Sequence, residues 1–314
     1  MKKGFSIITL LSVALILLIG CSTNPSSKND SSAYQIVEVE KTQALNADLK
    51  AGIPTIDMAI YYPNIQDTAF ARLMPMDALL ADFQYAKDIY AEVGVQLNLL
   101  WVKKFDIEPE LLTIMADKPI GAPPPDEDMN MYRQMQITKA SLTERTQNIF
   151  DTIIEPHSEN NRTVYLIGMK KVTMQFYEKD SLGVWEIVAG KTSGLSFPGY
   201  ILEDRIPERM RGVITINKVK PKIIAHELGH KVLNVSHEHK EIDPAHAIYH
   251  EEGLMLYGKG TEILSGKEGR WHKERLLLSP FIYIMDEDGN KVWNPDYKEA
   301  GHYFDPIYGG YVIK

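Results

Sequence analysis

The stretch from Thr55 to Val102 reads TIDMAIYYPNIQDTAFARLMPMDALLADFQYAKDIYAEVGVQLNLLWV, and it decides the fold. Its first residues alternate, with Ile56, Met58 and Ile60 on one face, which predicts a β-strand. Residues 77–93 carry apolar side chains at helical spacing, and residues 95–102 return to a strand-like pattern. A strand, a helix and a second strand in this order indicate a sheet with a crossover helix.

Further elements of the same kind follow in the chain. Ser141-Leu142-Thr143-Glu144 has the pattern of a capping box and predicts a helix that ends near Ile154. Apolar runs at residues 163–168 and 212–217 predict two more strands. Alternating strands and helices favour an α/β (α+β) fold with a twisted mixed sheet and crossover helices.

This pattern also suggests the domain boundaries. We expect one domain over residues 51–314. Its main part is expected at residues 51–236, where strands and helices alternate. Residues 237–314 lack that alternation and are expected to form a small irregular C-terminal subdomain.

The N-terminus has the composition of an export signal. Lys2 and Lys3 precede an apolar segment at residues 5–19 that is too short to span a bilayer comfortably. The next motif, Leu18-Ile19-Gly20-Cys21, resembles the lipobox of bacterial lipoproteins. The resemblance implies that residues 1–20 are a signal peptide, that cleavage falls before Cys21, and that Cys21 is lipidated.

Residues 21–50 are then expected to be a lipid-anchored flexible tether, because Ser22 to Ala33 is polar and lacks apolar periodicity. The lipid would hold the protein in the bacterial cell envelope, on the periplasmic or the cell-surface side of a membrane. Residues 34–50 are less clear and also fit a short strand followed by a linker.

Cysteine content and charge limit the possible partners. Cys21 is the only cysteine, so a chain lipidated there can form no disulfide. The formal net charge is −8, and loss of Lys2 and Lys3 with the leader makes it more negative by two. This acidity argues against nucleic-acid binding and against a basic membrane patch. We expect a monomer that contacts a membrane through its lipid.

Histidines gather in one part of the chain. Six of the nine lie between residues 226 and 250, and such clustering favours metal or proton chemistry. The six are His226, His230, His237, His239, His246 and His250.

The first two have a geometric reason to bind one ion. Pro221 suits the first turn of a helix, and a helix over residues 222–233 would place His226 and His230 on one face. Glu227 lies one position round the helix, where it can reach a water molecule on that ion. Zn²⁺ lowers the pKa of such a water to about 7. Glu227 could then take its proton as the water attacks a peptide carbonyl.

The sequence from His226 to Tyr257 resembles the metzincin family of zinc metalloproteases. The run His226-Glu-Leu-Gly-His230 is followed by His237 and later by Leu254-Met255-Leu256-Tyr257. The resemblance implies a zincin-like domain and one catalytic Zn²⁺ held by His226, His230 and His237. It also implies that Glu227 is the general base, that Met255 forms the floor of the site, and that Tyr257 helps to stabilise the transition state.

The chain departs from the family pattern at the third ligand. The turn glycine is missing, and His237 comes one residue late. Asn234 could replace the glycine, because Asn tolerates the left-handed conformation. His239, Glu251 and Glu252 remain alternative third ligands. A weaker resemblance concerns residues 194–199, which resemble the edge strand that metzincins offer to an extended substrate, although a surface loop fits equally well.

Three functions fit these observations. The first is a zinc endopeptidase that acts on polypeptides outside the cytoplasm. The second is a zinc hydrolase acting on a non-peptide amide. The third is a surface or periplasmic binding lipoprotein in which the histidine helix is only structural. The presence of Glu227 between two histidines argues against the third, because a binding protein needs no base there.

Overall fold

The computed structural model describes the chain from Tyr34 to Val312 with gaps. The described residues are 34–115, 143–155, 162–196, 212–235, 253–256, 258–266, 269, 271–293, 304–305 and 311–312. The predicted signal peptide, Cys21 and the first part of the predicted tether lie outside them. Within these ranges no helix is long and apolar enough to cross a membrane.

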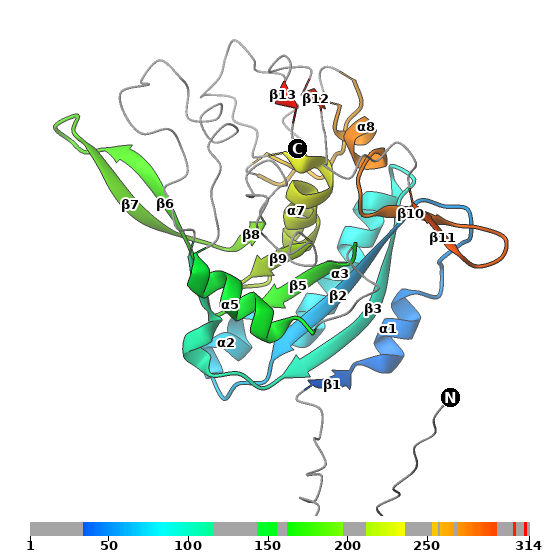
Figure 1. The fold of residues 1–314 in the computed structure, drawn as a ribbon, viewed down its shortest axis with the longest axis horizontal. Helices are drawn as coiled ribbons and strands as arrows, with labels where there is room; N and C mark the ends of the chain where they lie inside the picture. Colours follow the sequence, from blue (N-terminus) through cyan, green and yellow to red (C-terminus); the bar gives the residue numbers. More distant parts are fainter. Residues whose placement is uncertain are drawn as a thin grey trace, which may run out of the picture. The chain divides into compact units, whose positions relative to one another are not determined.

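Four parallel strands form the centre of the molecule, and all four were predicted (Figure 1). Their order is β3-β2-β5-β9, with parallel pairing throughout. The fold is therefore mixed α/β, as the alternation of elements indicated. The strands are β2 (Thr55–Pro63), β3 (Gln96–Phe105), β5 (Val164–Gly168) and β9 (Val213–Ile216).

Antiparallel strands extend this sheet and make it mixed. β1 (Tyr34–Val37) pairs with β3 at one edge, and β8 (Gly194–Ser196) pairs with β9 at the other. β10 (Ile282–Met285) pairs with the start of β2 and forms a hairpin with β11 (Lys291–Trp293). β8 is thus a short edge strand, one of the two alternatives for this segment.

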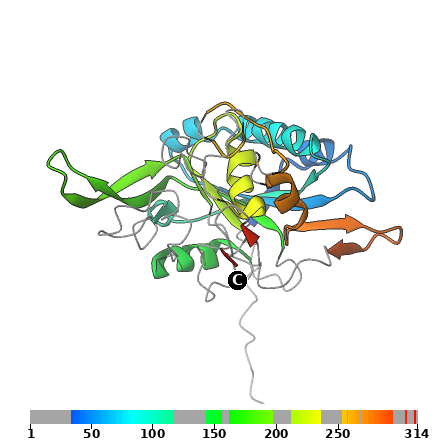
Figure 2. The same cartoon turned by 90° about the horizontal axis from the view of Figure 1, so that it is seen from above.

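Both faces of the sheet are covered, because alternate residues of β2 enter two separate cores. Ile56, Met58 and Ile60 pack in the core that contains α3 (Met76–Ala91) and α7 (Ile223–Gly229). Ala59 and Tyr61 face the opposite core, which contains α5 (Glu144–Ile153). Figure 2 shows α3 and α5 on opposite sides of the sheet. α7, the helix predicted to carry the site, therefore lies on the α3 side.

The predicted capping box has the wrong register. Thr143, not Ser141, is the N-cap of α5, and its side chain accepts a hydrogen bond from the backbone N–H of Thr146 at 3.0 Å. Thr143 is itself a good capping residue, because threonine is among the side chains favoured at the N-cap. A shorter helix, α2 (Thr68–Leu73), was not predicted. It is capped by Asp67, which accepts from Ala69 and Phe70.

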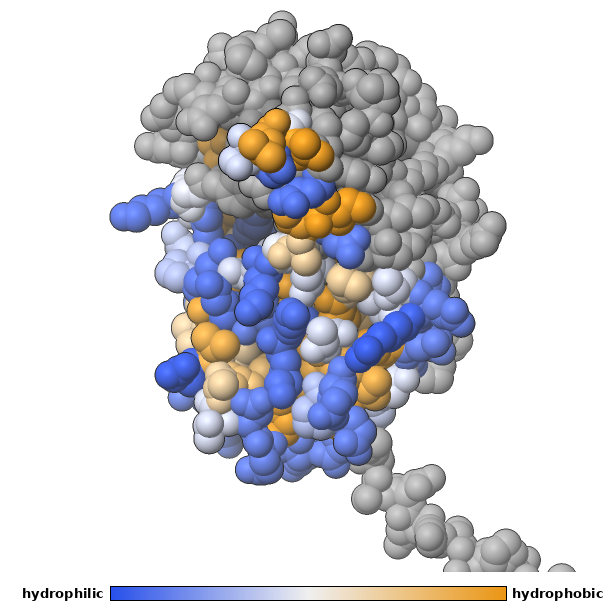
Figure 3. Space-filling view, turned by 90° about the vertical axis from the view of Figure 1, so that its left-hand side faces the viewer, coloured by the Kyte–Doolittle hydropathy of each residue, from blue (hydrophilic) through white to orange (hydrophobic). Residues whose placement is uncertain are grey.

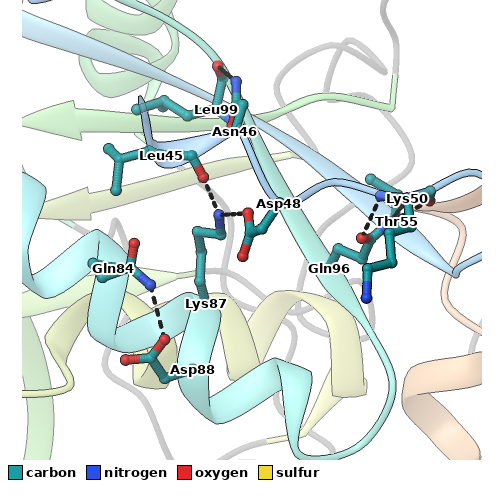
Figure 4. A network of polar contacts seen from close by, with 10 residues as sticks. All are labelled: Leu45, Asn46, Asp48, Lys50, Thr55, Gln84, Lys87, Asp88, Gln96 and Leu99. Atoms are coloured by element: carbon teal, nitrogen blue, oxygen red, sulfur yellow. Dashed lines mark hydrogen bonds and ion pairs between the residues drawn. The ribbon is translucent and has the colours of Figure 1, made fainter. Parts of the chain in front are cut away.

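Residues 34–50 belong to the folded unit, and the short strand that the sequence also allowed is confirmed. β1 joins the sheet, and α1 (Val39–Leu45) follows it. Figure 4 shows how the next loop is held: buried Lys87 of α3 reaches Asp48 at 2.6 Å and the carbonyl of Leu45. Asn46 exchanges two hydrogen bonds with the backbone of Leu99 on β3. The folded unit therefore begins at Tyr34, not at residue 51.

The described residues of the expected C-terminal subdomain pack on the main part of the fold. The residues from Tyr34 to Lys314 are one compact unit, and β10 belongs to the main sheet. α8 (His272–Leu277) contributes Leu276 to the same core as α7. A short two-stranded sheet, β12 (Phe304–Asp305) with β13 (Tyr311–Val312), lies in the last residues of the chain.

A long hairpin that the sequence did not reveal precedes β8. β6 (Lys171–Lys179) pairs with β7 (Trp185–Thr192) and with β4 (Thr113–Met115), which follows a 3₁₀ turn at Pro109–Leu112. The hairpin projects from the body in Figures 1 and 2. Leu182, Val184 and Ile187 near its turn are exposed. Figure 3 views the molecule from this side and shows apolar residues standing out among hydrophilic ones.

Candidate metal centre

The N-terminus of α7 is held by side chains from α3. Asp82 accepts a hydrogen bond from the backbone N–H of Ile224 at 2.9 Å, and the hydroxyl of Tyr90 donates to the carbonyl of Ala225 at 3.1 Å. Lys222 precedes the helix with a φ of 63°. Pro221 therefore lies before the N-cap and not in the first turn, contrary to expectation. Asp82 thus supplies a hydrogen bond at the helix start that the side chain of the N-cap residue, Lys222, does not.

The helix also ends differently from the prediction of a regular helix over residues 222–233. α7 ends at Gly229, and His230–Asn234 form a single π-helical turn. A π turn closes with i→i+5 hydrogen bonds and so takes in one more residue than an α turn. Such turns often occur at functional sites. Asn234, which was expected to replace the turn glycine in a left-handed conformation, lies inside this turn and is not among the residues with positive φ.

His226 on α7 and His230 at the start of the π turn lie together, as the spacing predicts. Their ring centroids are 4.8 Å apart and the rings are nearly perpendicular. Nδ1 of His226 lies 2.9 Å from the carbonyl oxygen of Leu254, and Nδ1 of His230 lies 2.8 Å from that of Val235. A carbonyl oxygen only accepts, so both Nδ1 atoms carry the proton and both rings have their lone pair on Nε2.

This tautomer is the one that a metal ligand needs. Histidines that bind metals usually donate the other ring N–H to a carbonyl or a carboxylate. Burial lowers the pKa of His226 to about 4 and that of His230 to about 3. Both imidazoles are therefore neutral near pH 7. These two residues fit a Zn²⁺ ion through Nε2.

Glu227 is buried between α7 and β8, with 4% of its surface exposed. Its carboxyl lies against Gly194, and its Oε2 has no hydrogen-bond partner among the described residues. Burial raises the pKa of Glu227 to about 8, while Lys220 and Lys231 act in the opposite direction. A divalent cation at the histidines would favour the ionised carboxylate. An orphaned buried carboxylate oxygen beside two neutral histidines fits a site that acquires an ion and water.

Lys231 is a second buried charged residue on this helix. Burial lowers its pKa to about 7, and the negative charge of Glu227, four positions earlier, opposes that shift. Lys231 lies in the π turn that follows α7, close enough to Glu227 for their charges to interact. The sequence did not suggest a role for Lys231.

Met255 lies against the same helix. Its side chain is buried, and a Cβ on Gly229 would come within 2.5 Å of the Met255 sulfur. The preceding residue, Leu254, supplies the carbonyl that orients His226. Residues 253–256 thus contact α7 at His226 and at Gly229, which lie before and after Glu227 in the sequence.

Several predicted site residues lie outside the described residues. They are Cys21, His237, His239, Glu251, Glu252 and Tyr257. In the part of the chain that the structure describes, no group of three or more His, Cys, Asp or Glu side chains is arranged to hold a metal ion. The described part therefore supplies two of the predicted ligands, the predicted base and Met255.

Comparison with known proteins adds no relative. No protein-family model matches this chain, and no curated protein is significantly similar to it.

Proposed function

We propose that this protein is a metzincin-like zinc endopeptidase. His226 and His230 would hold one Zn²⁺ ion through Nε2, and Glu227 would be the general base. We propose His237 as the third ligand, with His239, Glu251 and Glu252 as the alternatives. The substrate would be a polypeptide.

One observation carries this proposal. The two histidines of the motif donate their Nδ1 protons to two separate backbone carbonyls, 2.9 Å and 2.8 Å away. A helix that was only structural would not need both rings to be neutral and in the same tautomer. Fixing both rings in advance lowers the entropy lost when an ion binds.

The residues of the site have distinct roles in this proposal. A bound Zn²⁺ would polarise the peptide carbonyl and lower the pKa of water. Glu227 takes a proton from the attacking water and can return it to the leaving amine. Tyr257 is proposed to stabilise the oxyanion. Among the described residues β8 is the last strand at its end of the sheet, so an extended peptide would add as another strand at its outer edge.

The site is proposed to work outside the cytoplasm. The motif Leu18-Ile19-Gly20-Cys21 supports export and lipidation at Cys21. The membrane would then be a partner only through the lipid, and the folded unit that begins at Tyr34 would be the soluble catalytic part.

The first experiment is to measure zinc per chain in the protein from Tyr34 onward, by elemental analysis after dialysis against metal-free buffer. We expect a ratio near one. A ratio near zero in a folded sample would contradict the proposal and favour a binding lipoprotein.

The second experiment compares peptide cleavage by the wild type and by Glu227→Ala. The variant should bind zinc and cleave no peptide, because Glu227 is a base and not a ligand. Glu144→Ala, which removes a carboxylate from the exposed first turn of α5, is the matched control and should cleave normally. Equal cleavage by Glu227→Ala would exclude the mechanism. Hydrolysis of small amides without peptide cleavage would indicate a non-peptide substrate.

A further inference from the structure

Gly194 on β8 makes an unusually close approach to the Glu227 side chain. A Cβ added to Gly194 would lie 2.2 Å from Oε1, 2.5 Å from Cδ and 2.7 Å from Cγ of Glu227. Real Cβ contacts essentially never fall below 3.0 Å. Any larger residue at position 194 therefore requires either the strand or the carboxyl to move.

The backbone conformation does not explain this glycine. Gly194 is not among the glycines with positive φ, and it lies in a regular antiparallel ladder opposite Ile216. An L-residue could adopt the same backbone. The space occupied by Glu227 is what requires a glycine here.

The strand is the less movable of the two partners. The Thr192 hydroxyl donates to the carbonyl of Gly194 at 2.8 Å. Asn217 holds the residues just before Gly194, because its side chain donates to the carbonyl of Thr192 at 2.6 Å and its backbone N–H to that of Ser193 at 2.9 Å. A side chain added at position 194 would therefore displace Glu227 and not β8.

The helix cannot easily retreat either. Asp82 and Tyr90 of α3 bind the backbone of Ile224 and Ala225, which immediately precede the histidine motif. The Glu227 side chain thus projects from a fixed helix onto a fixed strand. Its position is set by the absence of a side chain at residue 194.

We propose that Gly194 is a positioning residue, which seats the carboxyl of Glu227 against β8 and aligns it with the His226–His230 pair. The inference rests on the proposed function for its catalytic meaning, but the contact itself can be tested without any activity. The same strand would have two uses: Gly194 orients the base, and the outer edge, which pairs with no other described strand, would bind the substrate.

The first test is a double-mutant cycle on the full chain, followed by thermal unfolding with a metal chelator present. Gly194→Ala should lower the melting temperature by about 3–6 °C. In the Glu227→Ala background, where the carboxyl is gone, the same substitution should change it by less than about 1 °C. An equal loss in both backgrounds would overturn the proposal, because Gly194 would then not act through Glu227.

The second test uses the zinc-loaded full chain. Gly194→Ala should reduce kcat for a peptide about 100-fold, with a small change in KM and an unchanged zinc content, because the base is displaced by about an ångström. Gly168→Ala, a strand glycine whose Cβ would meet Pro63 at 3.1 Å, is the control and should retain nearly full kcat. Unchanged kcat, or loss of zinc, in Gly194→Ala would contradict a positioning role.

The two tests separate the contact from the function. If the wild type cleaves no peptide, the proposed function fails, and the unfolding cycle alone decides whether Gly194 seats Glu227. If the cycle shows no coupling while Glu227→Ala abolishes cleavage, the proposed function stands and this inference fails.

Discussion

The sulfur of Met255 packs directly against Gly229, at a point where an added Cβ would lie 2.5 Å from it. Gly229 falls between Glu227 and His230 in the sequence, and the residue before Met255 supplies the carbonyl that orients His226. One contact thus connects residues 253–256 to the helix that carries the proposed ligands. The metzincin resemblance implies a methionine near the site, and Met255 lies against the helix that carries His226 and Glu227.

Gly229→Ala should lower the free energy of unfolding by about 1–3 kcal/mol, because the methyl group overlaps the buried sulfur. In a Met255→Ala background the sulfur is absent, and the sign should reverse. Alanine is favoured over glycine within a helix, so Gly229→Ala should then stabilise by about 0.5–1 kcal/mol. Urea denaturation of the four proteins measures both values. A loss of the same size in both backgrounds would show that Met255 is not the cause.

His237→Ala should lose zinc at neutral pH, because a catalytic zinc site needs three protein ligands. Elemental analysis after dialysis measures the loss. His246→Ala is the control, since we expect His246 to be an exposed histidine without a role in the site. Full retention of zinc by His237→Ala would indicate that His239, Glu251 or Glu252 is the third ligand.

Asp82 should make the stability of the protein depend on pH. Burial raises its pKa from 3.8 to about 6, although the backbone N–H groups of Ile224 and Lys222 act against this shift. The folded state therefore retains a proton that the unfolded chain loses near pH 4. The resulting stabilisation is present below pH 4 and is lost as the pH rises through 6.

Asp82→Asn keeps an oxygen that can accept from Ile224 but cannot ionise. Relative to the wild type it should gain roughly 2–3 kcal/mol between pH 4 and pH 7. Urea denaturation of both proteins across this range, with a chelator present, gives the difference directly. A difference that stays constant with pH would contradict the assignment to Asp82.

Lys291→Met should destabilise the protein by about 3 kcal/mol, because it leaves a buried carboxylate without its cation. Asp57 on β2 is 1% exposed and forms an ion pair with Lys291 on β11. It also accepts from Tyr283 at 2.7 Å and from Asn98 at 2.8 Å. Lys41→Met, which breaks an exposed pair with Asp77, is the control and should leave the stability almost unchanged. Similar losses from both variants would mean that burial of Asp57 does not matter.

Deletion of residues 1–33 should leave the melting temperature nearly unchanged, whereas deletion of residues 1–50 should lower it strongly. The longer deletion removes β1 and α1, and with them the Asp48 and Leu45 partners of buried Lys87. A buried ammonium group without partners costs several kcal/mol. Circular dichroism melting of the two fragments tests this. Equal melting temperatures of the two fragments would indicate that residues 34–50 behave as a tether.

Local patterns were sufficient for the centre of the fold. β2, α3, β3, β5 and β9 each carry their own apolar periodicity, so the sequence predicted them without any knowledge of their neighbours. Contacts between strands that are far apart in the sequence could not be predicted. β10 joins β2, and Tyr283 bonds to Asp57 across 226 positions, through contacts that no periodicity records. The boundary at residue 51 was wrong for the same reason, since β1 is stabilised by its pairing with β3.

The sequence by itself determined which chemical groups stand together on one helix. Helical spacing places His226 and His230 on one face with Glu227 beside them, because that geometry depends only on the 3.6-residue turn. Only the tertiary structure decided how these side chains are oriented and where their protons lie. The tautomer of His226 is fixed by the carbonyl of Leu254, and the Glu227 carboxyl is seated by Gly194 on another strand. Hydrogen-bond partners and steric limits come from distant segments, which only the folded chain brings together.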